Sequence, residues 1–424
     1  MDSLIYNLWL SLACTPDTPT FAKLLESFDS AEEIYTASDR DIRMAVGSTV
    51  SDCTALCDKN IEKAEKIYEF CKTKGVGIVS YWDDDFPPQL RDIPTPPVLL
   101  YYRGKIPNFE RKFSCAIVGT RALSDYGRKN AFSLGYDMVC AGSIIVSGMA
   151  IGIDGVALAG ALSAGGITVA VLGSGIDVCY PLQHLTLARE IVKCGCIFTE
   201  YPPGTRPDKF NFPRRNRLIS GLANVTVVVE GRETSGSLLT ARHAKAQNRP
   251  VYAFPGNVNS EGSQVTNLLL KNGAKVCTAA DDIVRDYENV VPMVLCQGKM
   301  PLKLPVKMHE ELRRYEIACV TPSDDIFIPP RPKPKAVLST DTSSTSNDKK
   351  EFTPVVQNTD APQDAFDKEA LKLYKKIPSD TECLIEELVD GEMDLKKVMR
   401  LLLKLEMGRF IKMLPGDRVK RNIR

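Results

Sequence analysis

The chain has almost no net charge: 54 Lys and Arg residues face 53 Asp and Glu residues, which leaves a formal charge of +1 at pH 7. This balance excludes a globally basic field, so any contact with a nucleic acid must come from a local patch. Long apolar runs are missing too. No segment approaches the roughly 20 apolar residues that cross a bilayer, and no membrane contact is expected.

Histidine is scarce, and the cysteines are not grouped. The 424 residues include 3 His and 13 Cys, with no Cys-x-x-Cys pair, so neither a zinc site nor another cofactor is expected. Scattered, reduced thiols are typical of a cytoplasmic protein. The apolar segment Leu4–Cys14 has neither a basic region before it nor a small-residue cleavage site after it. It is predicted to be a helix instead of a signal peptide.

Motifs of catalysis are missing as well. The sequence has no Gly-x-x-x-x-Gly-Lys-Ser/Thr loop, so ATP hydrolysis is not indicated. No Ser/His/Asp order or pair of carboxylates stands out. The segment Leu172–Asp177 contains Gly-x-Gly but lacks the third glycine of a dinucleotide loop, and it follows the third predicted strand instead of the first. We therefore expect no NAD site and a protein that is not an enzyme.

The length is sufficient for two or three domains, and the composition, 44% hydrophobic and 25% charged, is that of a globular protein. Residues 1–75 place apolar residues at helical spacing, which predicts a helical N-terminal domain. Residues 296–365, rich in Pro, Ser and Thr, are predicted to be a disordered linker. Residues 366–424 follow the order helix, helix, helix, strand, turn, strand, which predicts a winged helix.

Residues 76–295 alternate between apolar strands and helices. Strands are predicted at 77–81, 98–102, 115–118, 144–147, 169–172, 196–199, 225–229 and 251–254. Helices are predicted at 127–140, 154–164, 184–193, 238–247 and 265–271. Continuous apolar strands separated by helices predict an α/β domain with a doubly wound parallel sheet. Ligands of such sheets bind at the carboxyl ends of the strands.

Two loops at this edge of the predicted sheet carry glycine and polar groups. The loop Gly119–Arg121, with Ser124 beyond it, can offer backbone N–H groups and a bidentate guanidinium to a phosphate, although a plain turn with a surface Arg has the same sequence. Ser147 and Gly148 open the second loop, where a glycine lets a ligand approach the backbone. Asp154 then suits the N-cap of the following helix.

The strongest signal is the stretch Lys209–Arg217, which combines four cations with two aromatic rings in nine residues. Such interleaving suits a single-stranded nucleic acid, because rings stack on bases while cations hold phosphates. If the stretch is extended, its residues alternate between two faces, and Phe210 is assigned to the core more readily than Phe212. Ser235–Ser237 then opens a helix, where its donors can bind an anion or simply cap the helix.

The C-terminal segment is locally basic. Residues 395–424 hold ten Lys and Arg against Glu406 and Asp417. A basic winged helix commonly binds duplex DNA, and a solvated charged face or a protein-docking module fits these residues equally well.

Three functions remain open from the residues alone. The first is binding of single-stranded DNA. The second is a nucleotide-processing hydrolase, in which Glu200, Arg215 and Glu230 would serve a sugar-phosphate. The third is a transcription regulator whose winged helix binds duplex DNA.

Taken in order, the motifs resemble the DprA/Smf family of bacterial DNA-processing proteins. The resemblance is close over residues 75–290, and the helical N-terminus and terminal winged helix match the family's layout. It rests on Ile117–Arg121 with Ser124, Ser147-Gly-x-Ala-x-Gly-Ile-Asp154, Val169–Asp177 with Tyr180-Pro181, Glu200–Gly204, Phe212–Arg217, Ser235–Ser237, Pro255-Gly256 and Asn267.

The resemblance implies an extended Rossmann-like central domain, a SAM-like N-terminal domain and no catalysis. It implies that the protein binds and protects incoming single-stranded DNA during natural transformation and recombination and loads RecA onto it. It also implies a homodimer formed through the central domain, with duplex DNA or a protein as partner of the winged helix. By resemblance, Arg121 and Lys209 clamp phosphates and Phe212 stacks on a base.

Three positions depart from the family's pattern. Ile151 and Leu158 stand where relatives often carry Arg and His, and Leu182 stands where Lys is common. These departures argue against chemistry in that loop and lower the affinity expected along that side of the groove. The full set of candidate contacts to single-stranded DNA is Gly119, Thr120, Arg121, Ser124, Ser147, Gly148, Lys209, Phe212, Arg214, Arg215, Asn216, Arg217, Ser235, Gly236 and Ser237.

Overall fold

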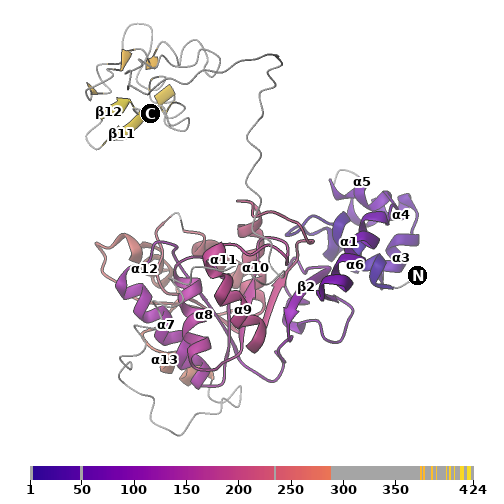
Figure 1. The fold of residues 1–424 in the computed structure, drawn as a ribbon, viewed down its shortest axis with the longest axis horizontal. Coiled ribbons are helices and arrows are strands. Elements are labelled where there is room, and N and C mark those ends of the chain that lie inside the picture. The colour runs from indigo at the N-terminus through magenta and orange to yellow at the C-terminus, as the bar shows by residue number, and fades with distance from the viewer. Residues whose placement is uncertain are drawn as a thin grey trace, which may run out of the picture. The chain divides into compact units, whose positions relative to one another are not determined.

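A computed structural model describes residues 3–47, 51–233 and 235–287, together with single residues and short segments between 373 and 421. The chain forms two compact units, Met1–Lys335 and Ala336–Arg424 (Figure 1). The predicted linker, residues 296–365, lies outside the described residues, as does most of the predicted winged helix. Among the described helices, none is long and apolar enough to cross a membrane.

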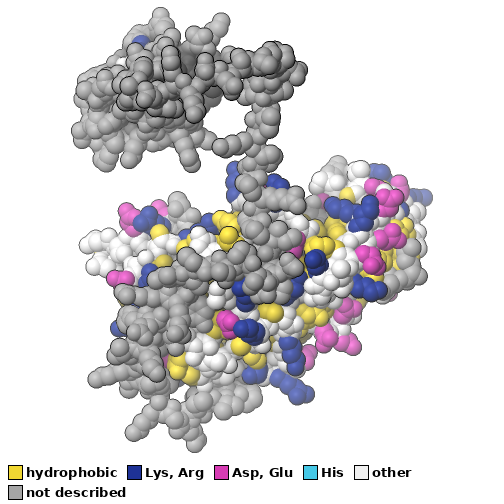
Figure 2. All heavy atoms as spheres, viewed as in Figure 1, with side chains coloured by type: hydrophobic (Ala, Val, Ile, Leu, Met, Phe, Trp, Pro, Cys, Tyr) yellow, Lys and Arg dark blue, Asp and Glu magenta, His cyan; other side chains and the backbone are white. Residues whose placement is uncertain are grey.

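Short helices make up the N-terminal part of the first unit, as the apolar spacing predicts. They are α1 (Ser3–Ala13), α2 (Thr20–Leu25), α3 (Ala31–Thr36), α4 (Asp39–Val46), α5 (Asp52–Cys57) and α6 (Glu62–Lys74). Ser30 and Ser38 start α3 and α4, since each hydroxyl accepts a hydrogen bond from a backbone N–H three residues on. Figure 2 shows Lys and Arg interspersed with Asp and Glu over these helices, in keeping with the near-zero net charge.

A nine-stranded sheet follows, with strand order β1-β2-β6-β5-β4-β3-β7-β8-β9. The pairs β1–β2 and β2–β6 are antiparallel, and every other neighbouring pair is parallel. The strands are β1 (Gly77–Ser80), β2 (Leu99–Gly104), β3 (Ser114–Val118), β4 (Ile144–Ser147), β5 (Thr168–Val171), β6 (Cys196–Thr199), β7 (Val225–Val228), β8 (Val251–Ala253) and β9 (Lys275–Val276).

Helices cover both faces of this sheet, which explains why its central strands are largely apolar and buried along their whole length. They are α7 (Asp125–Cys140), α8 (Ile153–Ser163), α9 (Leu185–Cys194), α10 (Asn211–Gly221), α11 (Ser237–Ala246), α12 (Gln264–Lys271) and α13 (Ala280–Tyr287). On one face, Cys115 and Ile117 of β3 belong to a core shared with α7–α9, α13 and the N-terminal helices. On the other, Ala116 and Val118 belong to a core shared with α10–α12.

The structure confirms the predicted α/β sheet, and the predicted strands lie within one or two residues of the observed ones. The structure differs from the sequence analysis at three points. The stretch from residue 211 is the helix α10 instead of an extended segment. The N-cap of α8 is Gly152, and Asp154 lies inside the first turn. Helix α13 and the short edge strand β9 have no counterpart among the predicted elements.

In the second unit, β10 (Cys383–Leu384), β11 (Ile411–Leu414) and β12 (Arg418–Arg421) form an antiparallel sheet in the order β10-β12-β11. Its described core includes Leu373, Ile377, Leu402 and Val419. The β11–β12 hairpin agrees with the predicted strand, turn and strand. The helices of the predicted winged helix lie largely outside the described residues, so that assignment stays a prediction.

Candidate nucleic-acid interface

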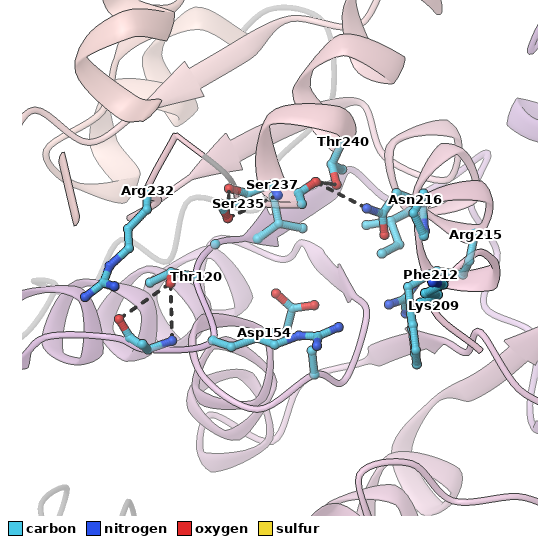
Figure 3. Close-up of a pocket in the computed structure, with 18 of the residues that line it drawn as sticks. Thr120, Asp154, Lys209, Phe212, Arg215, Asn216, Arg232, Ser235, Ser237 and Thr240 are labelled. Atoms are coloured by element: carbon cyan, nitrogen blue, oxygen red, sulfur yellow. Dashed lines mark hydrogen bonds between the residues drawn. The ribbon is translucent and has the colours of Figure 1, made fainter. Parts of the chain in front are cut away.

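A cavity of about 640 Å³ opens at the carboxyl end of the parallel sheet, between the loop after β3 and the first turns of α10 and α11. Ten of the fifteen candidate contacts line it, namely Gly119–Arg121, Lys209, Phe212, Arg215, Asn216 and Ser235–Ser237. Figure 3 shows Lys209, Phe212 and Arg215 on one side, Thr120 and Arg232 on the other, and Ser235 and Ser237 between them.

Helix α10 brings the basic and aromatic residues to the cavity. The Asp208 carboxylate accepts a hydrogen bond from the Phe210 N–H at 2.8 Å, and this turn starts the helix. Pro213 is tolerated because it lies in the first turn, where a backbone N–H has no partner within the helix. The helical path directs Phe212 into the cavity and leaves Phe210 62% exposed, so the assignment of Phe210 to the core was wrong.

The Phe212 ring is the centre of a cationic and aromatic cluster. The guanidinium carbons of Arg121 and Arg215 lie 5.4 and 5.9 Å from its centroid, within the range of a cation–π contact. The Tyr180 ring lies 5.5 Å away, tilted by 37°. Among the described residues, no carboxylate forms an ion pair with Arg121 or Lys209, so both cations can meet an anionic ligand.

Arg215 is held in the floor of the cavity and is only 4% exposed. Its guanidinium donates to the carbonyl oxygens of Gly148, at 2.7 Å, and Val171. The Asp154 carboxylate accepts from the Gly148 N–H at 3.1 Å. Burial lowers the pKa of Arg215 to about 10 while the nearby Asp154 opposes that shift, and burial raises the pKa of Asp154 against the pull of Arg215. Arg215 therefore stays charged at neutral pH and partly balances Asp154.

The cavity also contains neutral donors. The Ser235 and Ser237 hydroxyls share a hydrogen bond of 2.8 Å at the start of α11. The Asn216 amide donates to the Gly236 carbonyl oxygen at 3.3 Å, which ties α10 to this loop. Hydroxyls, an amide and a helix N-terminus beside free cations form a surface suited to phosphate oxygens.

Five candidates lie elsewhere. Gly148 lines a smaller adjoining recess. Ser124 caps α7, since its hydroxyl accepts from the Gly127 N–H at 3.1 Å, and Ser147 donates to the Ile117 carbonyl oxygen at 2.6 Å, joining β4 to β3. Arg214 and Arg217 do not line the cavity. Arg217 is 1% exposed and donates to both oxygens of Glu200.

The residues of the hydrolase alternative do not meet in this cavity. Glu200 is engaged by Arg217, and the Glu230 carboxylate, buried beside α7, accepts from the Ser124 N–H at 2.9 Å. Neither lines the cavity. In the described part of the chain, no group of three or more His, Cys, Asp or Glu is placed to hold a metal ion.

Several lining residues were not among the candidates. Tyr180 occurs in a quoted motif but received no role, Thr240 lies in the first turn of α11, and Arg232 lies four residues after the end of β7. The position of Arg232 just beyond a buried strand of a parallel sheet is the signal that could have identified it.

The nine-stranded, mostly parallel sheet is covered by helices on both faces and has a cavity at the carboxyl ends of its strands, which is where α/β proteins of this architecture bind their ligands. Known proteins identify the family. A model described as DNA recombination-mediator protein A matches residues 77–288. A putative DNA processing protein DprA from Mycobacterium tuberculosis is 34% identical over 320 residues, covering 73% of this chain and 81% of that protein.

Two further comparisons agree. Protein Smf from Synechocystis is 37% identical over 226 residues, covering 53% of this chain but only 56% of that protein's length. The X-ray structure of DNA processing protein A from Streptococcus pneumoniae superimposes with a TM-score of 0.58 at 32% identity, covering 68% of this chain and 98% of that one. The chain belongs to the DNA recombination-mediator protein A family.

Proposed function

We propose that this protein binds single-stranded DNA in the cavity at the carboxyl end of its sheet and acts as a DNA-processing recombination mediator. The observation that carries the proposal is the convergence of Arg121, Lys209 and Phe212 on one cavity. Cations beside a partly exposed ring hold a phosphate backbone and a base together. The names of the relatives, DNA processing proteins, agree with this ligand.

The ligand is a single strand because the aromatic group needs an unpaired base. The Phe212 ring lies within the cavity, near the guanidinium groups of Arg121 and Arg215, and only a base released from its partner can stack on it. Phosphates then lie towards Lys209 and towards the hydroxyls of Ser235 and Ser237. The fifteen candidate contacts divide accordingly, with ten at the ligand and Ser124, Ser147, Gly148, Arg214 and Arg217 supporting the loops.

The test is binding of a fluorescent oligothymidylate and of a duplex of equal length, followed by anisotropy over a series of salt concentrations. Arg121→Ala and Lys209→Ala are expected to weaken single-strand binding. Each removes about one phosphate contact, so the slope of log K against log salt falls by about 0.7. Arg111→Ala is the control, since Arg111 is exposed and does not line the cavity. Unchanged affinity and slope in both cavity variants would refute the proposal.

The protein is proposed to act without catalysis and to load RecA onto the bound strand. The one carboxylate among the described residues that line the cavity, Asp154, is buried beside Arg215, which leaves it poorly placed as a general base. RecA loading is measured as RecA filament formation on single strands coated with single-strand-binding protein. Wild-type protein is expected to shorten the lag, and Lys209→Ala to restore it.

The remaining organisation is proposed as follows: a helical domain at 1–75, an extended Rossmann-like domain at 76–295, a linker at 296–365 and a winged helix at 366–424. The winged helix would contact duplex DNA or a protein, and the site of action would be the cytoplasm. Deletion of residues 366–424 is expected to leave single-strand binding largely intact. Loss of that binding on deletion would place the main DNA site in the winged helix.

A homodimer through the Rossmann-like domain is also proposed. Val276 in the two-residue edge strand β9 and Leu268 in α12 are 54% and 38% exposed, and exposed apolar side chains at the edge of a sheet are a common place for self-association. Light scattering of wild type and Val276→Lys tests this. A wild-type dimer that Val276→Lys converts to a monomer is expected, and a wild-type monomer would refute it.

A further inference from the structure

A second, smaller recess adjoins the main cavity. Its walls come from the loop that follows β4, from Tyr180 and Pro181 ahead of α9, and from Phe212. Arg121 and Phe212 line both spaces, so the recess is continuous with the cavity that the proposed function assigns to the DNA backbone.

The rim of the recess is apolar and open to solvent. Ile151 is 45% exposed and Tyr180 39% exposed, and Leu182, next to Pro181, is 42% exposed. Arg121 is the one charged side chain among the described residues that line the recess. Large apolar side chains grouped beside a cationic cavity are typical of a surface that a ligand covers.

We infer that Tyr180 and Ile151 form a second base subsite, which accepts an unpaired nucleobase next to the one stacked on Phe212. The inference rests on the proposed function. The rings of Tyr180 and Phe212 are 5.5 Å apart and tilted by 37°, so they present neighbouring aromatic surfaces to one strand. Ile151 adds an apolar side chain to the same recess. Stacking of this kind is indifferent to the identity of the base.

Charge decides between a base and a phosphate as the occupant. The cations Lys209 and Arg215 and the Ser235–Ser237 loop line the main cavity but not the recess. A phosphate in the recess would meet only Arg121, whereas a base would cover apolar surface and a ring. The strand therefore passes with its phosphates along the cavity and its bases towards Tyr180.

The experiment compares two probes of equal length on the full chain: an oligothymidylate and the same backbone with abasic sites. Tyr180→Leu fills a similar apolar volume but cannot stack. It is expected to bind the oligothymidylate about fivefold more weakly or worse, to bind the abasic probe like wild type, and to keep the wild-type salt slope. Tyr180→Phe is expected to match wild type on both probes. Ile151→Ala is expected to show a smaller loss with the same selectivity for the base-containing probe.

Val258→Ala is the matched control, because Val258 is an exposed apolar residue that lines neither space. The inference is overturned if Tyr180→Leu binds the oligothymidylate like wild type, or if it loses equal affinity for both probes. Arg121→Ala distinguishes a failure of the base subsite from a failure of the proposed function. If it weakens binding while Tyr180→Leu does not, only the base subsite is wrong; if neither variant weakens binding, the proposed function is wrong as well.

Discussion

Arg217, in the middle of α10, donates from one guanidinium nitrogen to both carboxylate oxygens of Glu200, at 2.7 and 2.8 Å. Both side chains are buried, 2% and 10% exposed. The Arg217 Nε also lies 3.4 Å from Asp17 Oδ1, in the segment between α1 and α2. This ion pair therefore anchors the helix that carries Phe212 and Asn216 to the sheet and to the N-terminal helices.

Arg217→Met is expected to lower the free energy of unfolding by about 3–5 kcal/mol, because it leaves the Glu200 carboxylate buried without its partner. Urea unfolding followed by the fluorescence of Trp9 and Trp82 measures the loss. Asp281→Asn is the control, since it breaks the exposed ion pair with Arg285, and such pairs contribute little. Equal stability of Arg217→Met and wild type would show that the pair does not anchor α10.

The sheet was predictable from the sequence, whereas the roles of the arginines were not. Runs such as Ile144–Ser147 and Val225–Val228 are buried on both faces, and an apolar run between helices leaves few other structures open to them. The order of those runs also predicted that the candidate loops lie at one edge of the sheet, and most of the candidate contact residues do line the cavity there.

The rest depends on partners that are distant in the sequence. Arg215 belongs to the cavity because Gly148 and Val171 accept its hydrogen bonds, and Arg217 belongs to the interior because Glu200 lies beneath it. No local pattern separates two arginines that lie two residues apart. The turn ahead of α10 likewise includes a hydrogen bond from the Phe210 N–H to the Asp208 carboxylate, which an aromatic and Pro-containing stretch does not reveal.

Phe212→Ala is expected to weaken binding of an oligothymidylate by about 1–3 kcal/mol, which is the usual contribution of one stacked base. The salt slope should stay as in wild type, because no phosphate contact is lost. Anisotropy titrations at several salt concentrations measure both quantities. Val258→Ala shortens an exposed apolar side chain outside the cavity, and its affinity should not change. A loss of equal size in both variants would contradict the assignment.

The ionisation of Asp52 is expected to make the stability of the N-terminal helices depend on pH. Burial alone would raise the pKa of Asp52, but hydrogen bonds from Thr15, Thr18 and Thr20 outweigh it and lower the pKa below its ordinary value. A lowered pKa in the folded state means that the stabilisation is complete above about pH 4, the unfolded value, and is lost as the pH falls through the folded pKa.

Asp52→Asn is therefore expected to lower the free energy of unfolding by about 1.5–3 kcal/mol at pH 7, the usual contribution of hydrogen bonds to a charged group. Urea unfolding at a series of pH values should show this difference shrinking below about pH 4. Asp84→Asn, at an exposed position, should follow the wild-type curve throughout. A difference between Asp52→Asn and wild type that is constant down to pH 2 would exclude an ionised Asp52 as its source.

The backbone at Gly152 packs closely against the loop that carries Arg121, one of the cations proposed to bind DNA. Its φ is +97°, and a Cβ there would lie 2.3 Å from the Thr120 carbonyl oxygen and 2.7 Å from the Arg121 Cα. Gly152→Ala is expected both to destabilise the fold and to weaken binding of single-stranded DNA, because the loop that carries Arg121 must move.

Gly165→Ala is the matched control. At Gly165 φ is +71°, and nothing lies within 4 Å of the added Cβ. This variant should therefore lower the free energy of unfolding by about 1–3 kcal/mol through backbone strain and leave DNA affinity unchanged. Anisotropy and urea unfolding on both variants test the difference, and equal DNA affinity in the two would show that Arg121 does not depend on this contact.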